Sequence, residues 1–213
     1  MKPEEQRNDL LAGRLIKQLE QRHYNAMYCK TAQEAVKTIV GLIPDGSSVA
    51  WGGSMTIRDM GLTKALHDRA SLEIWDRDLA PDRDAAQAIY RKTFSADYYL
   101  SSVNAISESG EIVNIDGNGN RVAALIFGPK QVIVIAGLNK VAGSLDAAMD
   151  RARNVAAPIN AQRFAGLATP CYKLGRCADC QAADSICAQI VITRRSRTQG
   201  RIKVILVGEH LGF

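Results

Sequence analysis

Apolar residues in the first forty-four positions recur at the spacing of amphipathic helices. Between residues 4 and 22 the leucines and isoleucine fall three or four positions apart, which predicts a helix with one buried face. A second helix begins at Thr31, because Thr31 and Glu34 form a capping-box pattern before an apolar run. Pro44 and Gly46 end it.

The central part of the chain alternates between strand and helix patterns. Residues 48–51 form a short apolar strand, and two glycines separate it from a helix that Ser54 is expected to cap. A strand at 72–78, a helix at 81–94 and a strand at 96–106 continue the alternation. This rhythm predicts an α/β fold built on an open, mostly parallel sheet.

The pattern changes after residue 110. Residues 111–114 and 121–127 are predicted to be two strands of a hairpin, because Asp-Gly and Asn-Gly steps lie between them. The remaining predicted elements are a central strand at 131–137, helices at 144–156 and 159–168, and strands at 190–193 and 202–207. We expect one domain over 1–213, in which 158–213 forms a C-terminal segment with the cysteines and the closing strands.

Charge and hydropathy limit the classes of function. The 213 residues carry a net charge of +5, concentrated partly in a basic loop at 194–203. The loop lacks interleaved aromatic residues and a recognition helix, so it indicates a solvated surface and not a nucleic-acid interface. No apolar run is long enough for a bilayer, and the opening residues lack a signal-peptide pattern, so we expect a cytoplasmic protein without a membrane partner.

Four of the five cysteines fall within seventeen residues, with the spacing C-x5-C-x2-C-x6-C; they are Cys171, Cys177, Cys180 and Cys187. Thiolates hold zinc or iron, and the short Cys177–Cys180 step lets one turn direct two sulfurs to the same point. Structural zinc sites usually have two short-spaced pairs, whereas this run is nearer to ferredoxin spacings. We therefore rank an iron–sulfur cluster first, with 4Fe–4S ahead of 2Fe–2S.

Two other interpretations of the cysteines stay open. The first is a zinc ion, and the second is a set of free thiols or a redox-active disulfide. The fifth cysteine, Cys29, stands alone and is expected to be a small buried apolar side chain.

Glycine-rich turns follow two of the predicted parallel strands. Ligands of open α/β sheets bind beyond the carboxyl ends of the strands, where glycines let an anion approach the backbone. The candidate residues for a small anionic ligand at this edge are Gly52, Gly53, Ser54, Thr56, Asn139 and Lys140. A tight turn with a serine cap and a surface lysine explains the same residues without a ligand. Arg121 is a further candidate anion contact, and no nucleophile with an adjacent base is recognised.

Several stretches together resemble the LUD (lactate utilisation) domain family. They cover most of the chain from Ala50 onward and are WGGSMTIRDMGL, VNIDGNGNRVAALIFGP, VIVIAGLNKV, RARNVAAPINAQR, the TPC and CADC cysteines, and VILVGEHLGF. The resemblance implies an open sheet with helices on both faces, as in sugar-phosphate isomerases and CoA transferases. The chain looks like a short stand-alone member that carries a cysteine motif.

The resemblance also implies an association with bacterial oxidation of L-lactate to pyruvate. The larger iron–sulfur subunit of that system carries C-x2-C-x2-C-x3-C motifs, which this chain lacks, so it is not that subunit. The leading hypothesis is an accessory or electron-transfer component in oxidation of lactate or a related 2-hydroxy acid, working with a redox partner protein, and a homo-oligomer is compatible with it. The alternative is a small-molecule-binding enzyme or sensor with a structural zinc ion. No dinucleotide fingerprint extends the Gly52–Ser54 turn.

Overall fold

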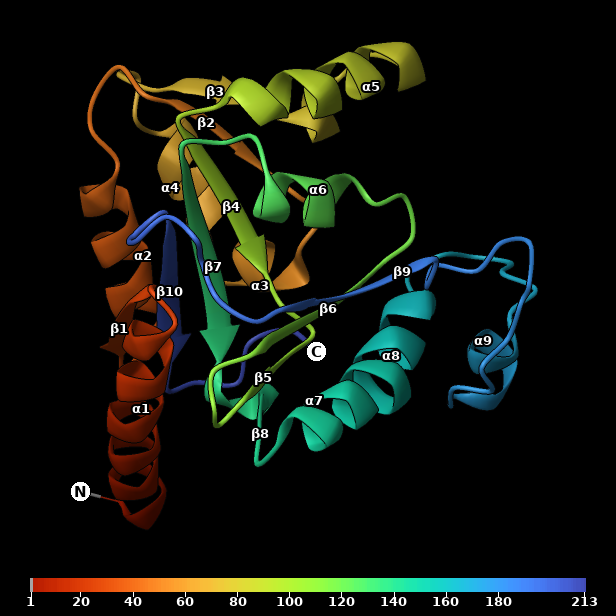
Figure 1. Ribbon diagram of the computed structural model, residues 1–213. Helices are drawn as coiled ribbons and strands as arrows, with labels where there is room; N and C mark the ends of the chain where they lie inside the picture. Colours follow the sequence, from red (N-terminus) through yellow and green to blue (C-terminus); the bar gives the residue numbers. More distant parts are fainter. Residues whose placement is uncertain (1) are drawn as a thin grey trace.

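The computed structural model describes residues 2–213 and contains two sheets (Figure 1). All strands of the larger sheet are parallel, in the spatial order β1 (Asn25–Cys29), β10 (Ile202–Val207), β7 (Gln131–Gly137), β4 (Tyr98–Ser102), β2 (Ser48–Trp51) and β3 (Glu73–Trp75). The apolar run predicted as a central strand is β7, which lies between β10 and β4 and is buried along almost its whole length. A strand with apolar residues on both faces is typical of a parallel sheet covered on both sides.

Helices cover both faces of this sheet, as the sequence predicted. On one face, Val132 and Val134 of β7 pack with α1 (Pro3–Gln21) and α6 (Asn120–Ile126). On the other face, Ile133 and Ile135 pack with α2 (Ala32–Leu42), α3 (Met55–Asp59) and α4 (Leu62–His67). Alternate side chains of one strand therefore supply two separate cores.

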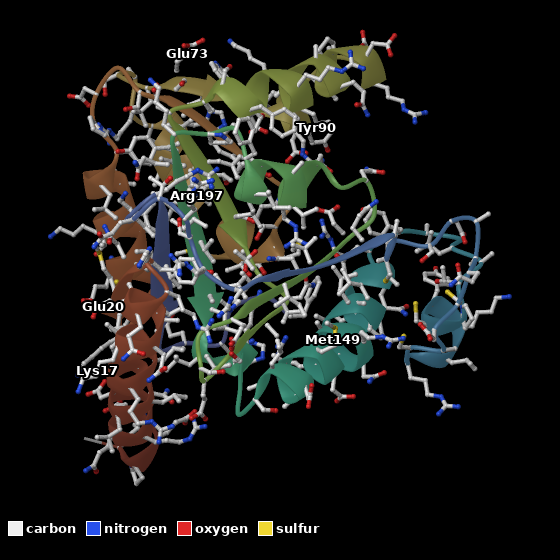
Figure 2. All side chains as sticks on the ribbon, viewed as in Figure 1. Lys17, Glu20, Glu73, Tyr90, Met149 and Arg197 are labelled. Atoms are coloured by element: carbon white, nitrogen blue, oxygen red, sulfur yellow. The ribbon has the colours of Figure 1, made fainter. Side chains whose placement is uncertain are left out.

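Charged residues lie on the outer surfaces of α1 and α5. Lys17 and Glu20 are exposed on the outer side of α1 (Figure 2). Helix α5 (Arg83–Lys92) begins after Asp82, whose carboxylate caps it by accepting a hydrogen bond from the Ala85 amide. It lies beside β3 at the edge of the large sheet (Figure 1).

The smaller sheet has the order β8 (Val141–Ala142), β5 (Ala105–Ser107), β6 (Ile112–Asp116) and β9 (Gln189–Thr193). Its inner residues contact the α1 core, and its other face packs against the helical segment that starts with α7 (Leu145–Arg151). That segment continues through a π-helical turn, Ala152–Ala156, into α8 (Ala157–Ala161). Helix α9 (Pro170–Leu174) lies apart from the large sheet, in the cysteine segment (Figure 1).

The predicted hairpin at 111–127 is wrong in its second half. β6 forms as expected, but residues 120–126 are helix α6. The carboxylate of Asp116 accepts hydrogen bonds from the amides of Gly119 and Val122, and so it starts a helix from the same Asp-Gly-Asn-Gly residues that suggested a hairpin. Val122 and Leu125 are buried at helical spacing.

Other elements also differ from the sequence predictions. β1 was not predicted, and the strand predicted at 96–106 is two strands, β4 and β5, which belong to different sheets. The helix predicted at 159–168 ends at Ala161, as the continuation of the helical segment that begins at Leu145.

Within residues 2–213, none of the helices combines the length and apolar character needed to cross a membrane.

Candidate functional site

A cavity of about 510 Å³ opens at the carboxyl ends of β2 and β4, beside the turn after β7. Its wall includes the turn Gly53–Thr56 after β2, Ser102–Asn104 after β4, and Lys140 from the short 3-10 helix Leu138–Lys140. Residues 116–121 of the smaller sheet and α6, and residues 160–164 after α8, complete the wall. This is the edge at which ligands of open α/β sheets bind.

Lys140 lies at the bottom of this cavity, with 2% of its surface exposed. Its Nζ donates hydrogen bonds to Thr56 Oγ1 at 2.9 Å, Ser102 Oγ at 3.0 Å and the Val103 carbonyl at 3.2 Å. All three acceptors are uncharged. No carboxylate pairs with this amine among the ion pairs of residues 2–213.

The surroundings of Lys140 disfavour its charged form. Burial, together with the smaller effects of the nearby guanidinium groups of Arg151 and Arg121, lowers its pKa from 10.5 to about 7. An ordinary surface lysine remains protonated well above neutral pH, whereas this amine changes its protonation state near neutrality. Buried lysines with such pKa values serve as bases and nucleophiles in enzymes.

Arg121 supports the wall and has little capacity left for a ligand. Its two terminal nitrogens donate to the Ser102 carbonyl, the Ile115 carbonyl, Asn114 Oδ1 and Asn104 Oδ1, at 2.6–3.2 Å. Its Nε lies 3.5 Å from a carboxylate oxygen of Asp116. Arg121 therefore ties β4, β6 and α6 together beside the cavity, instead of making the anion contact suggested by the sequence.

Arg77 and Arg163 keep donor groups available. Arg77 lies over the ring of Tyr90, 5.0 Å from its centroid. Its buried Nε lies 3.6 Å from Asp78 Oδ1, so its terminal nitrogens are the donors that a ligand could use. Arg163 has one side-chain hydrogen bond, from Nη1 to Asn160 Oδ1 at 3.0 Å. Partial burial and the neighbouring guanidinium groups of Arg58 and Arg77 lower the pKa of Arg163. Two adjacent guanidinium groups with free donors are a favourable environment for a carboxylate or phosphate.

Gly53 lets the Arg77 guanidinium approach the turn after β2 closely. A Cβ atom there would lie 2.5 Å from Arg77 Nη2, so the guanidinium packs directly on the backbone of the turn.

The wall also carries two carboxylate side chains, and both already accept hydrogen bonds. Asp116 caps α6, and Asp184 accepts a hydrogen bond from the Ala168 amide at 2.6 Å. Four basic side chains against two engaged carboxylates make the cavity cationic.

The six residues proposed from the sequence have different positions relative to this cavity. Gly53, Ser54, Thr56 and Lys140 line it. Gly52 lies behind the wall, where a Cβ would be 2.7 Å from the Tyr99 hydroxyl. Asn139 binds the C-terminal residues, because its Oδ1 accepts from the Leu211 amide at 3.1 Å.

Sequence reasoning missed several polar residues of this wall, among them Ser102, Arg77 and Arg163. Arg77 and Ser102 lie inside the strands predicted at 72–78 and 96–106, which the sequence extended beyond the observed ends at Trp75 and Ser102, so the sheet-edge rule did not select them. Arg163 follows a helix that the sequence extended too far, so no local pattern identified it.

A second cavity, of about 520 Å³, is lined by all four clustered cysteines. Cys171 is on α9, Cys177 and Cys180 are in the loop after it, and Cys187 precedes β9. The space is many times the roughly 30 Å³ of one water molecule. In the chain from Lys2 onward, no three His, Cys, Asp or Glu side chains converge as the ligands of a single ion. All five cysteines are free thiols.

The thiols are close enough to influence one another. Burial, followed by the proximity of Cys171, Cys177 and Cys180, raises the pKa of Cys187 to about 11. Asp179 adopts a left-handed φ of 50°, and its amide donates a hydrogen bond to Cys177 Sγ at 3.4 Å. The carboxylate of Asp179 pairs with Arg153, which also lines the cavity.

The two cavities share one wall. Ile115 of β6 and three residues of the segment 183–186, namely Ala183, Ser185 and Ile186, line both of them. Gly117 fits closely against this wall, because a Cβ there would lie 3.3 Å from Ile186 Cα. The cationic cavity and the cysteine cavity are therefore neighbours across a partition one residue thick in places.

One comparison with known proteins identifies the family, and a solved structure supports the fold. The family model described as the LUD domain matches residues 12–207. A crystal structure of a DUF162 family protein from Deinococcus radiodurans is similar over 94% of this chain and 98% of that chain, with a TM-score of 0.57 and 12% identity. A crystal structure of eIF2B delta from Chaetomium thermophilum covers 68% of this chain and 57% of its own, with a TM-score of 0.35 and 16% identity. No curated protein sequence matches the chain.

Proposed function

The chain belongs to the LUD domain family, whose name refers to lactate utilisation, and from this premise we propose that it is a redox component in the oxidation of lactate or a related 2-hydroxy acid. In this proposal the four clustered cysteines hold an iron–sulfur cluster, and the cationic cavity binds the carboxylate of a small organic acid. The observation that carries the proposal is the wall shared by the two cavities.

The cysteine cavity fits a group larger than one ion. Its four thiols come from α9, from the following loop and from Cys187 shortly before β9, and they line a cavity of about 520 Å³. The Asp179 amide already donates to Cys177 Sγ, and such hydrogen bonds to cysteine sulfur tune the reduction potentials of iron–sulfur centres. A cluster bound by Cys171, Cys177, Cys180 and Cys187 would supply one-electron transfer.

The cationic cavity supplies the other half of the proposal. Arg77 and Arg163 have free donors for a carboxylate, and Lys140 adds an amine that can hold or release a proton near pH 7. An amine of this kind suits proton transfer to or from a hydroxyl group of an organic acid. The protein partner that accepts or delivers electrons is part of the proposal, since the chain has no dinucleotide fingerprint.

A second candidate function is a small-molecule-binding enzyme or sensor in which the cysteines hold a structural zinc ion. The observation that favours it is the independence of the Lys140 site: Thr56, Ser102 and Val103, which hold the amine, all belong to the large-sheet side of the molecule. Such a site would keep its geometry whatever occupies the cysteines.

The decisive experiment is to measure iron, zinc and acid-labile sulfide on protein purified without oxygen, together with its visible spectrum. Iron and sulfide in matched amounts, with the broad visible absorption of thiolate-bound iron, support the redox proposal. Zinc without sulfide contradicts it and supports the second candidate.

The matched variants for this measurement are Cys180→Ser and Cys29→Ala. Cys180 lines the cysteine cavity, whereas Cys29 is 2% exposed and packs in the core around α2. We expect Cys180→Ser to lower the metal content and Cys29→Ala to leave it unchanged. Equal metal content in both variants would refute the four-cysteine site.

A further inference from the structure

Lys140 has a chemical capacity that the redox proposal does not require. We propose that Lys140 is a carbonyl-reactive amine, and that the cationic cavity binds a 2-oxo acid whose carbonyl carbon forms a reversible Schiff base with its Nζ. The inference rests on the proposed function only in the choice of a 2-oxo acid, which is the oxidation product of a 2-hydroxy acid. The reactivity itself is argued from the surroundings of Lys140.

The contacts of Lys140 suit an amine that is neutral for part of the time. A lysine kept as a permanent ammonium in a protein interior is normally paired with a carboxylate. Here the partners are the hydroxyl groups of Thr56 and Ser102 and the Val103 carbonyl. A hydroxyl group can either accept from the ammonium or donate to the lone pair of the neutral amine. The same pocket therefore accommodates both protonation states.

Positive charge surrounds the amine from other elements. Arg121 on α6 donates to the Ser102 carbonyl while Lys140 donates to the Ser102 hydroxyl, so the two cations meet on one residue. Arg151 on α7 fixes the backbone next to the lysine, through a hydrogen bond of 3.0 Å from its Nε to the Asn139 carbonyl. Both guanidinium groups and the burial lower the pKa of Lys140 to about 7, which leaves a large neutral fraction at physiological pH.

The same cavity has anchors for the acid group. The turn Gly53–Thr56 contacts the Arg77 guanidinium at its first residue and Lys140 Nζ at its last. Arg163 adds a second guanidinium with free donors. In this proposal the carboxylate of the 2-oxo acid binds an arginine and its carbonyl group meets the amine, whereas a simple anion would use the arginines alone.

The proposed reaction balances without a further reagent. The lone pair of neutral Nζ attacks the carbonyl carbon of the 2-oxo acid, and proton transfer gives a carbinolamine. Loss of one water molecule then forms the carbon–nitrogen double bond of the Schiff base, and addition of water reverses the reaction. No electrons are gained or lost by the pair of reactants.

The test is reductive trapping on the full chain. The protein is incubated with pyruvate and sodium cyanoborohydride near pH 7, and the labelled peptide is located by mass spectrometry. A trapped adduct adds the mass of pyruvate less one oxygen atom. Roughly one ordinary lysine in a few thousand is neutral at pH 7, so Lys140 should be labelled at least about tenfold faster than any other lysine.

Two variants provide the controls. Lys140→Arg keeps the charge and removes the reactive amine, so labelling of this peptide should vanish. Lys130→Arg changes an exposed lysine that pairs with Asp97, and labelling at Lys140 should be unaffected. Thermal unfolding of Lys140→Arg checks that the chain is folded, and lactate, which has the carboxylate without the carbonyl, should slow the labelling by competition.

The inference is overturned if folded wild-type protein shows no adduct at Lys140, or if its labelling rate equals that of the exposed lysines. Neither result depends on the metal content of the cysteine cavity. A protein with zinc or with no metal that still traps pyruvate at Lys140 would refute the redox proposal and leave this inference standing. A protein that contains the cluster but traps no pyruvate at Lys140 would support the redox proposal and refute this inference.

Discussion

The buried amine of Lys140 should make the stability of the fold depend on pH in an unusual direction. In the unfolded chain its pKa is close to 10.5, and in the folded chain burial lowers it to about 7. Between these values the unfolded state binds more protons, so the free energy of unfolding rises with pH. The penalty for burying the amine is complete below pH 7 and absent above pH 10.5. Lys140→Met, which keeps an unbranched side chain, should remove this dependence.

The size of the effect follows from the pKa change. One pKa unit corresponds to about 1.36 kcal/mol, and the folded amine is half titrated at pH 7. Raising the pH from 7 to 9 should therefore increase the free energy of unfolding of the wild type by about 2 kcal/mol. Lys140→Met should not show this increase. The variant is expected to fold, because the Ser102 hydroxyl already lies 3.2 Å from Thr56 Oγ1 and the two can satisfy each other.

Urea unfolding at pH 7, 8 and 9 measures this difference. Titrations of the tyrosines and cysteines are common to both proteins, so they cancel when the two pH profiles are subtracted. Lys130→Met is the matched control, because this exposed lysine stays protonated over the whole interval and its profile should run parallel to the wild type. If the Lys140→Met profile is also parallel to the wild type, the amine is not half neutral at pH 7.

Further predictions concern other parts of the molecule. Gly137→Ala should lower the free energy of unfolding by about 1–3 kcal/mol, because its Cβ would lie 2.7 Å from the Glu209 carbonyl and 2.8 Å from the Leu211 amide. Gly143→Ala, which meets no atom within 4 Å, is the control, and equal losses in urea unfolding would contradict the packing argument. Hydrogen bonds from Lys130 and Ser48 lower the pKa of Asp97 from 3.8 to about 2, so its contribution to stability is present above pH 3.8 and lost as the pH falls through 2. Wild type should therefore lose about 1 kcal/mol more of its free energy of unfolding on acidification than Asp97→Asn does, after allowance for solvent screening. An unchanged midpoint of acid unfolding in the variant would show that the carboxylate is unpaired in solution. The rate of pyruvate trapping at Lys140 should rise through pH 7 and level off by pH 9, whereas a rate that still climbs steeply above pH 9 would indicate an ordinary lysine.

The central strands of the large sheet could be predicted from the sequence because they are buried on both faces, whereas the less buried edge strand β1 was missed. The run 132–136 is apolar throughout and short, and only a central strand or a buried helical turn fits such a run. The prediction of a second hairpin strand at 121–127 was wrong for a different reason. Asp116 can support either a turn or a helix start, and the choice depends on the packing of Val122 and Leu125, which no local pattern contains.

The candidate site could be predicted only in outline. The rule for parallel sheets placed Gly53, Ser54, Thr56 and Lys140 at one edge, and the structure brings these four together. The rule could not show that Lys140 is buried, because the hydroxyl groups that bind its amine belong to residues 56 and 102, which are far from Lys140 in the chain. The cysteine spacing similarly identified four candidate ligands without revealing the cavity beside them.

The position of β10 determines when the large sheet can be completed. β10 lies between β1 and β7, and β1 has no other partner in the sheet. During synthesis on a ribosome, β1 must therefore wait until more than 170 residues have followed it, from Cys29 to Ile202, before its backbone groups are paired. Contacts so distant in sequence slow folding and leave unpaired strand edges exposed in the nascent chain. The β10-facing edges of β1 and β7 therefore stay unpaired until the final strand has left the ribosome.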